Sequence, residues 1–328
     1  MSDSSHSRPA NEPEPQTSAS NRVSWRRYAL GLWRDKVSLF ALAFLILLII
    51  SAVLPGLLSP FDPLRQNLGL RNSPPLTPSA GDSMLPHLLG TDPLGRDLLS
   101  RLVYGARVSL LVGFTGVLVS GTVGVLLGTV AGYLRGWVDD LIMRLVDLTM
   151  GLPFIVLAIF VLHVVGGGLT NVVLILAAVR WPLYARVSRG LTLSLTESSF
   201  VEAARSIGCS QRRIIFRHLM PNLASPMLVL GTLELARLIL AEASLSFLGL
   251  GIQPPTPSWG LMISDGRAYI RSAWWVIAFP GLFILLTALS ANLLASWLRS
   301  ITDPAQRWRW LAGRSRPSGA ISVDGDAA

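Results

Sequence analysis

"EAARSIGCSQRRIIFRHLMPN", residues Glu202 to Asn222, is an arginine-rich insert in a chain that otherwise consists mostly of apolar runs. The chain is 51% hydrophobic, and only 14% of its residues are charged, against about a quarter in an ordinary soluble domain. A helix needs about 20 predominantly apolar residues to cross a bilayer. We therefore predict an all-α integral membrane protein with six transmembrane helices. The predicted spans are roughly 37–58, 108–132, 142–165, 170–188, 223–248 and 273–298.

The positive charges indicate how these helices are oriented. Nearly all of the 28 basic residues are Arg, and most of them flank apolar segments. With the N-terminus in the cytoplasm, nineteen basic residues fall on the cytoplasmic side and seven on the other side, as the positive-inside rule requires. The net charge of +9 is therefore explained by membrane topology, and we expect no nucleic-acid partner. The insert and both termini are predicted to be cytoplasmic.

This orientation divides the chain into five parts. The N-terminal part is rich in Ser, Pro and Glu and lacks the apolar core of a signal peptide, so we expect it to be disordered. The expected parts are a basic cytoplasmic tail at 1–35, the first transmembrane helix at 36–59, an extracytoplasmic loop at 60–106, a five-helix core at 107–300 and a cytoplasmic C-terminal tail at 301–328. The insert belongs to a cytoplasmic loop at 190–222 within the core.

The insert itself predicts two short helices joined at a corner. Ser199 and Glu202 have the spacing of a capping box, which would start the first helix. Gly208 supplies the left-handed residue that ends a helix. Ser210 can cap a second helix, and Pro221 stands where the chain is expected to turn into the fifth span.

One face of the first short helix is predicted to be apolar, because Phe200, Val201, Ala204 and Ile207 recur at near-helical spacing. Ala203 and Ala204 keep part of the surface flat enough for another protein to approach closely. Two interpretations stay open from spacing alone. The unit either docks a partner or simply closes the helix bundle on its inner face.

A resemblance favours docking. The insert resembles the EAA loop of permease subunits of binding-protein-dependent ABC importers, although His218 and Met220 stand where the general pattern has Ile and Leu. In that family the loop inserts a short coupling helix into a groove on a cytoplasmic ATPase. The resemblance implies that the ATPase-coupling residues here are Glu202, Ala203, Ala204, Arg205, Gly208 and Pro221.

Three other stretches resemble one branch of this family, the second permease of dipeptide, oligopeptide and nickel importers. They are "GTDPLGRDLLSRLVYGARVSLLVG" (Gly90–Gly113), "EASLSFLGLGIQPPTPSWG" (Glu242–Gly260) and "AWWVIAFPG" (Ala273–Gly281). The likeness covers about residues 25–305, but "NLLASWLRSITDP" departs from the family pattern. It implies the type I ABC importer permease fold in a bacterial cytoplasmic (inner) membrane. The implied cargo is a di- or oligopeptide, with nickel or another small solute as the alternative.

The resemblance also implies partners. They are a homologous second permease in a heterodimer, two cytoplasmic ABC ATPase domains, an extracytoplasmic solute-binding protein and the lipid bilayer. The sequence agrees on one point independently, because its only lysine is Lys36 and no phosphate-loop lysine exists. We therefore expect no bound cofactor and no catalytic residue in this chain, with ATP and Mg bound by the partner ATPases. A lone Cys209 and four scattered His predict no metal site.

Charges inside the predicted spans are functional candidates by default. Glu234 and Arg237 lie three residues apart and can pair on one helix face, and Arg144 with Asp147 has the same spacing. Arg180 stands alone in the fourth span. We expect structural pairing or gating from these charges in preference to direct contact with cargo. The pathway or gating candidates are Asp147, Arg180, Glu234, Arg237 and Glu242.

Two weaker patterns and two other classes of protein complete the predictions. Gly124, Gly128 and Gly132 form a small-residue row that lets helices approach, either within the chain or against a partner permease. Arg307–Trp310, "RWRW", is typical of an interfacial anchor.

A secondary transporter would show internal repeats and a row of coordinating carboxylates, and an intramembrane enzyme would need a nucleophile facing a base. Neither pattern is evident in the sequence.

Overall fold

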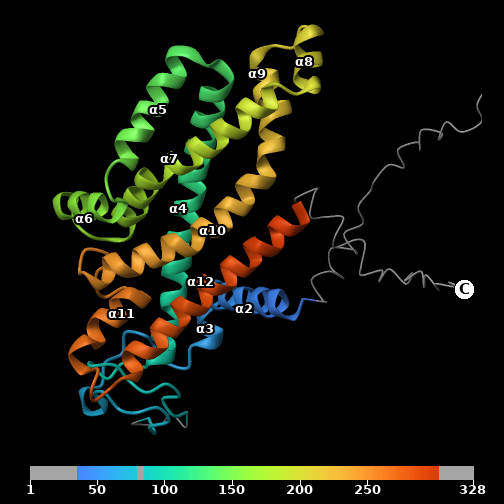
Figure 1. The fold of residues 1–328 in the computed structure, drawn as a ribbon. Helices are drawn as coiled ribbons and strands as arrows, with labels where there is room; N and C mark the ends of the chain where they lie inside the picture. Colours follow the sequence, from blue (N-terminus) through green and yellow to red (C-terminus); the bar gives the residue numbers. More distant parts are fainter. Residues whose placement is uncertain (1–34, 80–84, 303–328) are drawn as a thin grey trace, which may run out of the picture.

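The computed structural model describes residues 35–79 and 85–302, and within these ranges every regular element is a helix (Figure 1). The predicted all-α class is confirmed. The tails expected at 1–35 and 301–328 lie almost wholly outside the described residues, as does the predicted anchor Arg307–Trp310. The elements are α2 (Lys36–Val53), α3 (Pro55–Leu58), η1 (Leu68–Leu70), α4 (Leu98–Leu134), α5 (Gly136–Met150), α6 (Phe154–Val165), α7 (Leu169–Thr196), α8 (Ser199–Ser206), α9 (Gln211–Arg213), the π-helical turn η2 (Ile214–Leu219), α10 (Met220–Phe247), α11 (Trp259–Gly266), η3 (Arg267–Tyr269) and α12 (Trp275–Thr302).

The first apolar helix, α2, begins where its sequence provides a cap. The Asp35 carboxylate accepts the backbone N–H of Val37 at 3.2 Å and the hydroxyl of Ser38 at 2.6 Å. The Ser38 hydroxyl is the main reason that the pKa of Asp35 is lowered. A negative charge is thereby held at the positive end of the helix dipole, just outside the apolar run.

The number of candidate spans in the described residues agrees only approximately with the six predicted. Four helices of the described chain are long and apolar enough to cross a membrane, or five if a bent helix pair counts as one span. The four are α2, α4, the continuous helix Gln211–Phe247 and α12. The predicted fourth span is indeed a helix, α7, but Asn171, Arg180 and Arg186 interrupt its apolar run. The six-span prediction is therefore right about where helices form and only approximate as a count.

The predicted third span is broken. Helices α5 and α6 meet at an angle of 84° around Gly151 and Pro153, and a proline at this place removes a backbone donor that a continuous helix would need. α5 carries Asp139 and Asp147 and is amphipathic, whereas α6 is apolar but only 12 residues long. About 18 Å of helix cannot cross a hydrocarbon core of about 30 Å on its own.

The glycine row packs α4 against α7 within this chain. A Cβ atom added at Gly124 would lie 2.4 Å from the carbonyl oxygen of Trp181, and one at Gly128 would lie 2.2 Å from that of Ala185. Both distances are far below contact, so only glycine allows the two backbones to approach this closely. Of the two interpretations of the row, the structure supports packing within the chain.

The apolar core has two main clusters. The first joins α2, α4, α10, α11 and α12 around Trp259, which is fully buried and donates its indole N–H to the carbonyl of Leu102 at 3.0 Å. The second joins α4, α6, α7 and α10 around Leu162, Leu176 and Leu238. Because α4 and α10 contribute to both clusters, they form the spine of the molecule.

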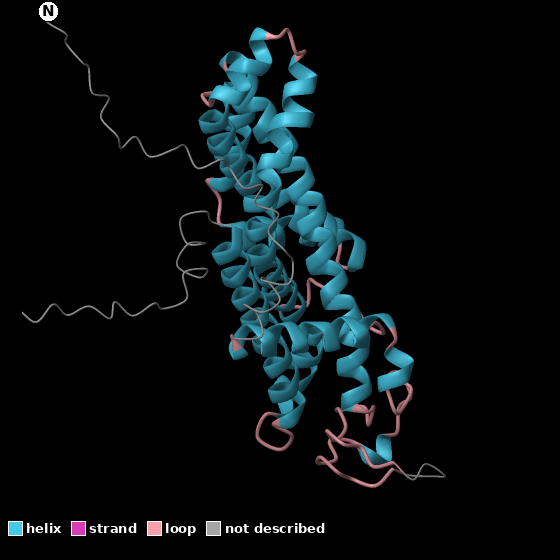
Figure 2. Ribbon diagram, turned by 90° about the vertical axis from the view of Figure 1, so that its right-hand side faces the viewer, coloured by secondary structure: helices cyan, strands magenta, loops and turns pink. Residues whose placement is uncertain are grey.

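The two ends of the molecule differ in construction. α8 and α9 lie at one end, and residues 55–79 and 85–97 lie at the opposite end (Figures 1 and 2). Figure 2 shows mostly loop at the end built by residues 55–79 and 85–97, whereas the end with α8 is mostly helix. α4 reaches from one end to the other with 37 residues, or about 55 Å.

Candidate functional site

The insert forms a helical corner at one end of the bundle, which we call the α8 loop (residues 197–219). α8 ends at Ser206, and Gly208 follows two residues later with a left-handed φ of +76°. The N–H of Gly208 donates to the carbonyl of Arg205 at 2.9 Å, and the N–H of Cys209 donates to that of Ala204 at 3.0 Å. These two bonds make a Schellman motif. The prediction that Gly208 ends the first helix and makes the corner is confirmed.

The predicted capping box is wrong. Ser198, not Ser199, occupies the cap position of α8, and no side chain bonds to the first turn there. The Ser198 hydroxyl donates instead to the carbonyl of Leu195 at the end of α7, so the capping serine is committed to the preceding helix. Glu202 is exposed on the first turn, where its negative charge interacts favourably with the positive end of the helix dipole.

The predicted apolar stripe divides into a buried and an exposed part. Val201 and Ala204 are buried and pack with Ile214, Ile215 and Leu219 in a small cluster of their own. Phe200 and Ile207 are exposed, Ile207 to 80%. The two alanines also differ, because Ala203 is exposed and Ala204 belongs to the cluster. Of this pair, only Ala203 presents a flat surface to a partner.

The second half of the α8 loop continues straight into α10. Ser210 precedes α9 as predicted, but its side chain makes no capping bond. Pro221 lies within the first turn of α10, directly after the π-helical turn η2, and the helix runs unbroken from Gln211 to Phe247. The expected turn at Pro221 is therefore wrong. The π turn is a bulge of the kind found inside otherwise continuous α-helices.

Arg205 points back toward the bundle. Its guanidinium lies 5.3 Å from the ring centroid of Tyr133, near the end of α4, a distance typical of a cation–π contact. Arg135, two residues further along, makes an exposed ion pair with Glu197 at 3.5 Å. Both contacts tie the α8 loop to the end of α4.

A cluster of three charges joins α7 to α10 at mid-helix. Glu234 is fully buried, and its carboxylate accepts the Nε of Arg180 at 2.8 Å and the Nη1 of Arg237 at 2.7 Å. The predicted pairing of Glu234 with Arg237 is confirmed. The prediction that Arg180 stands alone is wrong, since it pairs with Glu234. Glu234 lies on a different helix, so the spacing of residues along the sequence does not reveal this pair. The Arg180 guanidinium also covers the ring of Phe154 at 5.2 Å.

Two further ion pairs hold α5 against α7. Arg189 binds Asp139 through two hydrogen bonds of 2.5 and 2.6 Å, and Arg186 pairs with Asp147. The predicted pair of Asp147 with Arg144 is wrong, and Arg144 makes no ion pair within the described part of the chain. A side chain on a packed neighbouring helix has displaced the one three residues away.

Glu242 is buried among hydroxyl groups. Its carboxylate accepts the hydroxyl of Ser246 at 2.7 Å and that of Ser109 on α4 at 3.3 Å. Ser246 also accepts the backbone N–H of Ile252 at 3.0 Å. These bonds fasten α10 to α4 and to the connection that follows α10, which is a structural role for this carboxylate.

The comparisons with known proteins decide the family. Residues 124–308, more than half of the chain, match the family described as binding-protein-dependent transport system inner membrane component. The chain belongs to this family of permeases. Residues 24–75 also match the N-terminal TM domain of oligopeptide transport permease C, so the branch indicated by the three sequence motifs is confirmed.

Individual relatives cover nearly the whole permease. The di/tripeptide transport system permease protein DppC of Pseudomonas aeruginosa is 39% identical over 299 residues, which is 91% of this chain and 97% of the relative. The glutathione transport system permease protein GsiD of Escherichia coli is 42% identical over 287 residues, or 86% of this chain and 91% of the relative. GsiD of Shigella flexneri is 43% identical over the same length.

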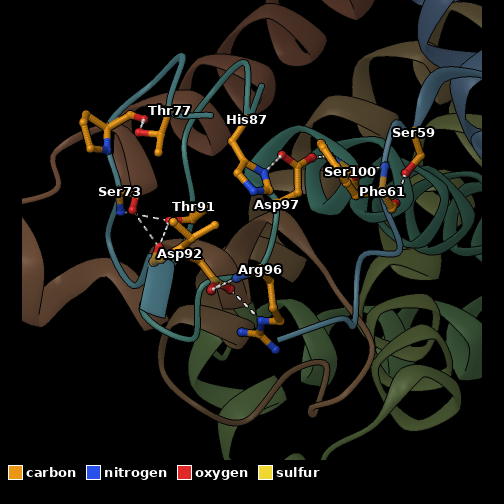
Figure 3. Close-up of polar contacts among 12 residues, drawn as sticks. Ser59, Phe61, Ser73, Thr77, His87, Thr91, Asp92, Arg96, Asp97 and Ser100 are labelled. Carbon is orange, nitrogen blue, oxygen red and sulfur yellow. Dashed lines mark hydrogen bonds and ion pairs between the residues drawn. The ribbon is translucent and has the colours of Figure 1, made fainter. Parts of the chain in front are cut away.

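The permease also has a polar cap (residues 55–79 and 85–101), which the sequence marked only by the family resemblance of Gly90–Gly113 (Figure 3). Its centre is Asp92, which is buried and accepts the backbone N–H groups of Leu94 and Arg96 and the Nε of Arg96 at 2.6 Å. Arg101 also pairs with Asp92. Asp265 of α11 lies 3.5 Å from Arg96, and burial raises its pKa although both guanidiniums favour the charged form.

A second carboxylate of the polar cap fixes the start of α4. Asp97 accepts the backbone N–H of Ser100 at 2.8 Å and contacts Nδ1 of the buried His87 at 2.9 Å, as Figure 3 shows. This cap starts α4 at Leu98, ten residues before the predicted span, so the helix extends beyond the apolar run. The sequence signal for this polar cap is the motif "TDPLGRD", in which two Asp and an Arg surround Gly95, whose φ is +71°.

Proposed function

We propose that the permease is the transmembrane subunit of an ATP-driven importer and forms half of the translocation pathway for short peptides. An extracytoplasmic solute-binding protein delivers the cargo. The support for this cargo class is that relatives aligned over about nine-tenths of the chain are named for di/tripeptide and glutathione transport. Nickel or another small solute is the alternative cargo for the same architecture.

The proposed assembly is a heterodimer of this permease with a homologous permease in the bacterial inner membrane. Two cytoplasmic ABC ATPase domains bind ATP and Mg and hydrolyse the ATP, and this chain takes no catalytic part in that hydrolysis. Both termini and the α8 loop face the cytoplasm in this proposal, which rests on the distribution of arginines along the chain.

The observation that carries the coupling role is the exposed face of α8. Ile207 and Phe200 are exposed although both are large and apolar, and they stand beside the exposed Glu202 and Ala203. Exposed apolar side chains that are grouped and rimmed by polar ones mark a contact surface. The buried Val201 and Ala204 anchor the opposite face of the helix, so a force on the exposed face reaches α7 and α10. We infer that this face, with Arg205, Gly208 and Pro221 shaping its base, docks on an ATPase domain.

The test compares two glycines at the same end of the molecule. Gly208 (φ +76°) and Gly136 (φ +62°) are both left-handed, and neither would meet another atom within 4 Å if a Cβ were added. Proline is incompatible with this backbone at either place. We would reconstitute the complete complex with cargo-loaded binding protein and measure ATP hydrolysis and peptide uptake for wild type, Gly208→Pro and Gly136→Pro.

The proposal predicts that Gly208→Pro abolishes cargo-stimulated hydrolysis and uptake while the complex stays assembled, and that Gly136→Pro keeps most of both. Unchanged hydrolysis and uptake in Gly208→Pro would show that the α8 loop does not couple the subunits. Uptake by the permeases without their ATPases would overturn the importer class itself in favour of a secondary transporter.

A further inference from the structure

The mid-helix cluster of Arg180, Glu234 and Arg237 has an unbalanced charge. Two guanidiniums share one carboxylate, so the cluster carries a net charge of +1. Glu234 is fully buried and the side chain of Arg180 is 16% exposed, whereas that of Arg237 is 63% exposed. The uncompensated positive charge therefore resides on the residue that faces outward.

This charge lies deep in the membrane-spanning region. Arg237 is ten residues before the end of α10 at Phe247, and Arg180 is eleven residues after the start of α7 at Leu169. At a rise of 1.5 Å per residue, both are about 15–17 Å from those helix ends. A hydrocarbon core about 30 Å thick places that depth near its middle.

The face of α10 that carries Arg237 is the one left open by its neighbours. Ala236 packs against Ala288 and Ala291 of α12, and Leu235 with Ile239 lies against Gly113 of α4. The remaining face presents Arg237 and, one turn on, Leu240, which is also exposed. A guanidinium at mid-membrane is too costly to leave facing lipid. The open face therefore borders water or a polar partner.

We propose that Arg237 binds the C-terminal carboxylate of the transported peptide as it passes the middle of the membrane. This inference rests on the proposed function, because it assumes a peptide cargo. Every peptide with a free C-terminus carries this group whatever its side chains, so one guanidinium serves a varied cargo. Arg237 uses its Nη1 for Glu234, and a guanidinium has five N–H donors. Enough donors remain for a bidentate contact with a carboxylate.

Glu234 sets the strength of this site. It holds the Arg237 guanidinium by a 2.7 Å hydrogen bond and is itself fixed by Arg180 from α7. The same carboxylate cancels one of the two positive charges, which lowers the attraction for an incoming anion. A positioned but partly neutralised guanidinium gives a weak site, and a weak site suits a pathway that must release its cargo.

The experiment measures equilibrium binding of radiolabelled trialanine to the complete transporter complex in nanodiscs, with the binding protein omitted. The variants are wild type, Arg237→Gln, Arg237→Lys and, as a matched control, Arg144→Gln, which removes the same charge from an exposed position on α5. We expect Arg237→Gln to weaken binding at least tenfold. Arg144→Gln should stay within about threefold of wild type, whereas Arg237→Lys should weaken binding less than Arg237→Gln does, since a lysine keeps the charge but loses the bidentate contact. Trialanine amide should compete at least tenfold less well than trialanine.

Four results would overturn the proposal. They are undetectable trialanine binding by wild type, equal binding by Arg237→Gln and wild type, equal competition by the amide and the free acid, and failure of Arg237→Gln to assemble with the second permease. The last would show that Arg237 serves the contact with the second permease and not the binding of cargo. Failure of the proposed function is distinguishable, because wild type would then show no uptake of trialanine that depends on ATP and the binding protein.

Discussion

The polar cap and the α8 loop lie at opposite ends of one molecule and are stabilised by different forces. In the polar cap, buried Asp92 and Asp97 organise guanidinium groups, an imidazole and backbone N–H groups. In the α8 loop, a small apolar cluster around Val201 and Leu219 lies beneath a helix whose other face is exposed. Buried ionic networks fix a single arrangement, whereas a thin apolar support leaves a surface available for a partner. The comparison suggests a rigid end and a docking end.

Asp92→Asn should break the rigid end most severely. Its carboxylate pairs with Arg96 and Arg101, whose side chains are 8% and 2% exposed. The amide would leave both guanidiniums without an anionic partner at Asp92, and removing one partner of a buried pair costs about 3–5 kcal/mol. We expect this loss in thermal unfolding of the purified complex followed by tryptophan fluorescence. Asp62→Asn in the same segment, an exposed residue, should cost less than about 1 kcal/mol. Equal losses would show that the network of Asp92 does not stabilise the polar cap.

Gly95→Ala and Gly208→Ala compare the two ends by the same substitution. Both glycines are left-handed, at φ +71° and +76°, so each alanine carries a backbone cost of about 1–2 kcal/mol. A Cβ at Gly95 would also lie 1.8 Å from the carbonyl oxygen of Asn67, whereas one at Gly208 meets nothing within 4 Å. We expect a total cost of about 3 kcal/mol or more at Gly95 and only the backbone cost at Gly208, measured as shifts of the unfolding midpoint. A larger loss at Gly208 would contradict the assignment of the rigid end.

Val201→Ala and Ile207→Ala sharpen the comparison within α8, and their effects should be the smallest. Val201 is fully buried, and removing two methyl groups should cost about 1–2 kcal/mol. Ile207 is 80% exposed, so its truncation should change stability by less than about 0.5 kcal/mol. If the α8 face docks on an ATPase, Ile207→Ala should nevertheless lower cargo-stimulated ATP hydrolysis several-fold in the reconstituted complex. A variant with normal hydrolysis would remove Ile207 from the docking surface.

Local signals in the sequence predicted local structure well. Apolar runs placed most of the long helices, Gly208 placed the corner, and the three-residue spacing of Glu234 and Arg237 predicted their ion pair. Each of these features depends on residues close together along the chain. Helical geometry alone therefore decides them.

Contacts between helices could not be predicted in the same way. Arg180 finds Glu234 across 54 residues, and Arg186 takes Asp147 from its neighbour Arg144. The hydroxyl of Ser198 goes to the preceding helix, which defeats the capping pattern of α8. These outcomes depend on which helix faces are packed together, and one sequence without a structure does not determine that. Pro153 is evident in the sequence, but it does not predict the break between α5 and α6, because a proline within an apolar run is compatible with both a straight and a broken span.

The continuity of α4 has a mechanical consequence. Its first turn is fixed by Asp97 in the polar cap, and its last turn carries Tyr133 beneath Arg205 of the α8 loop. Between these ends the glycine row brings its backbone against that of α7, so the two helices can tilt only together. Two helices packed together bend less than one, so a rotation at one end of the pair is transmitted to the other end. Any displacement imposed on the α8 loop would then reach the polar cap, about 55 Å away.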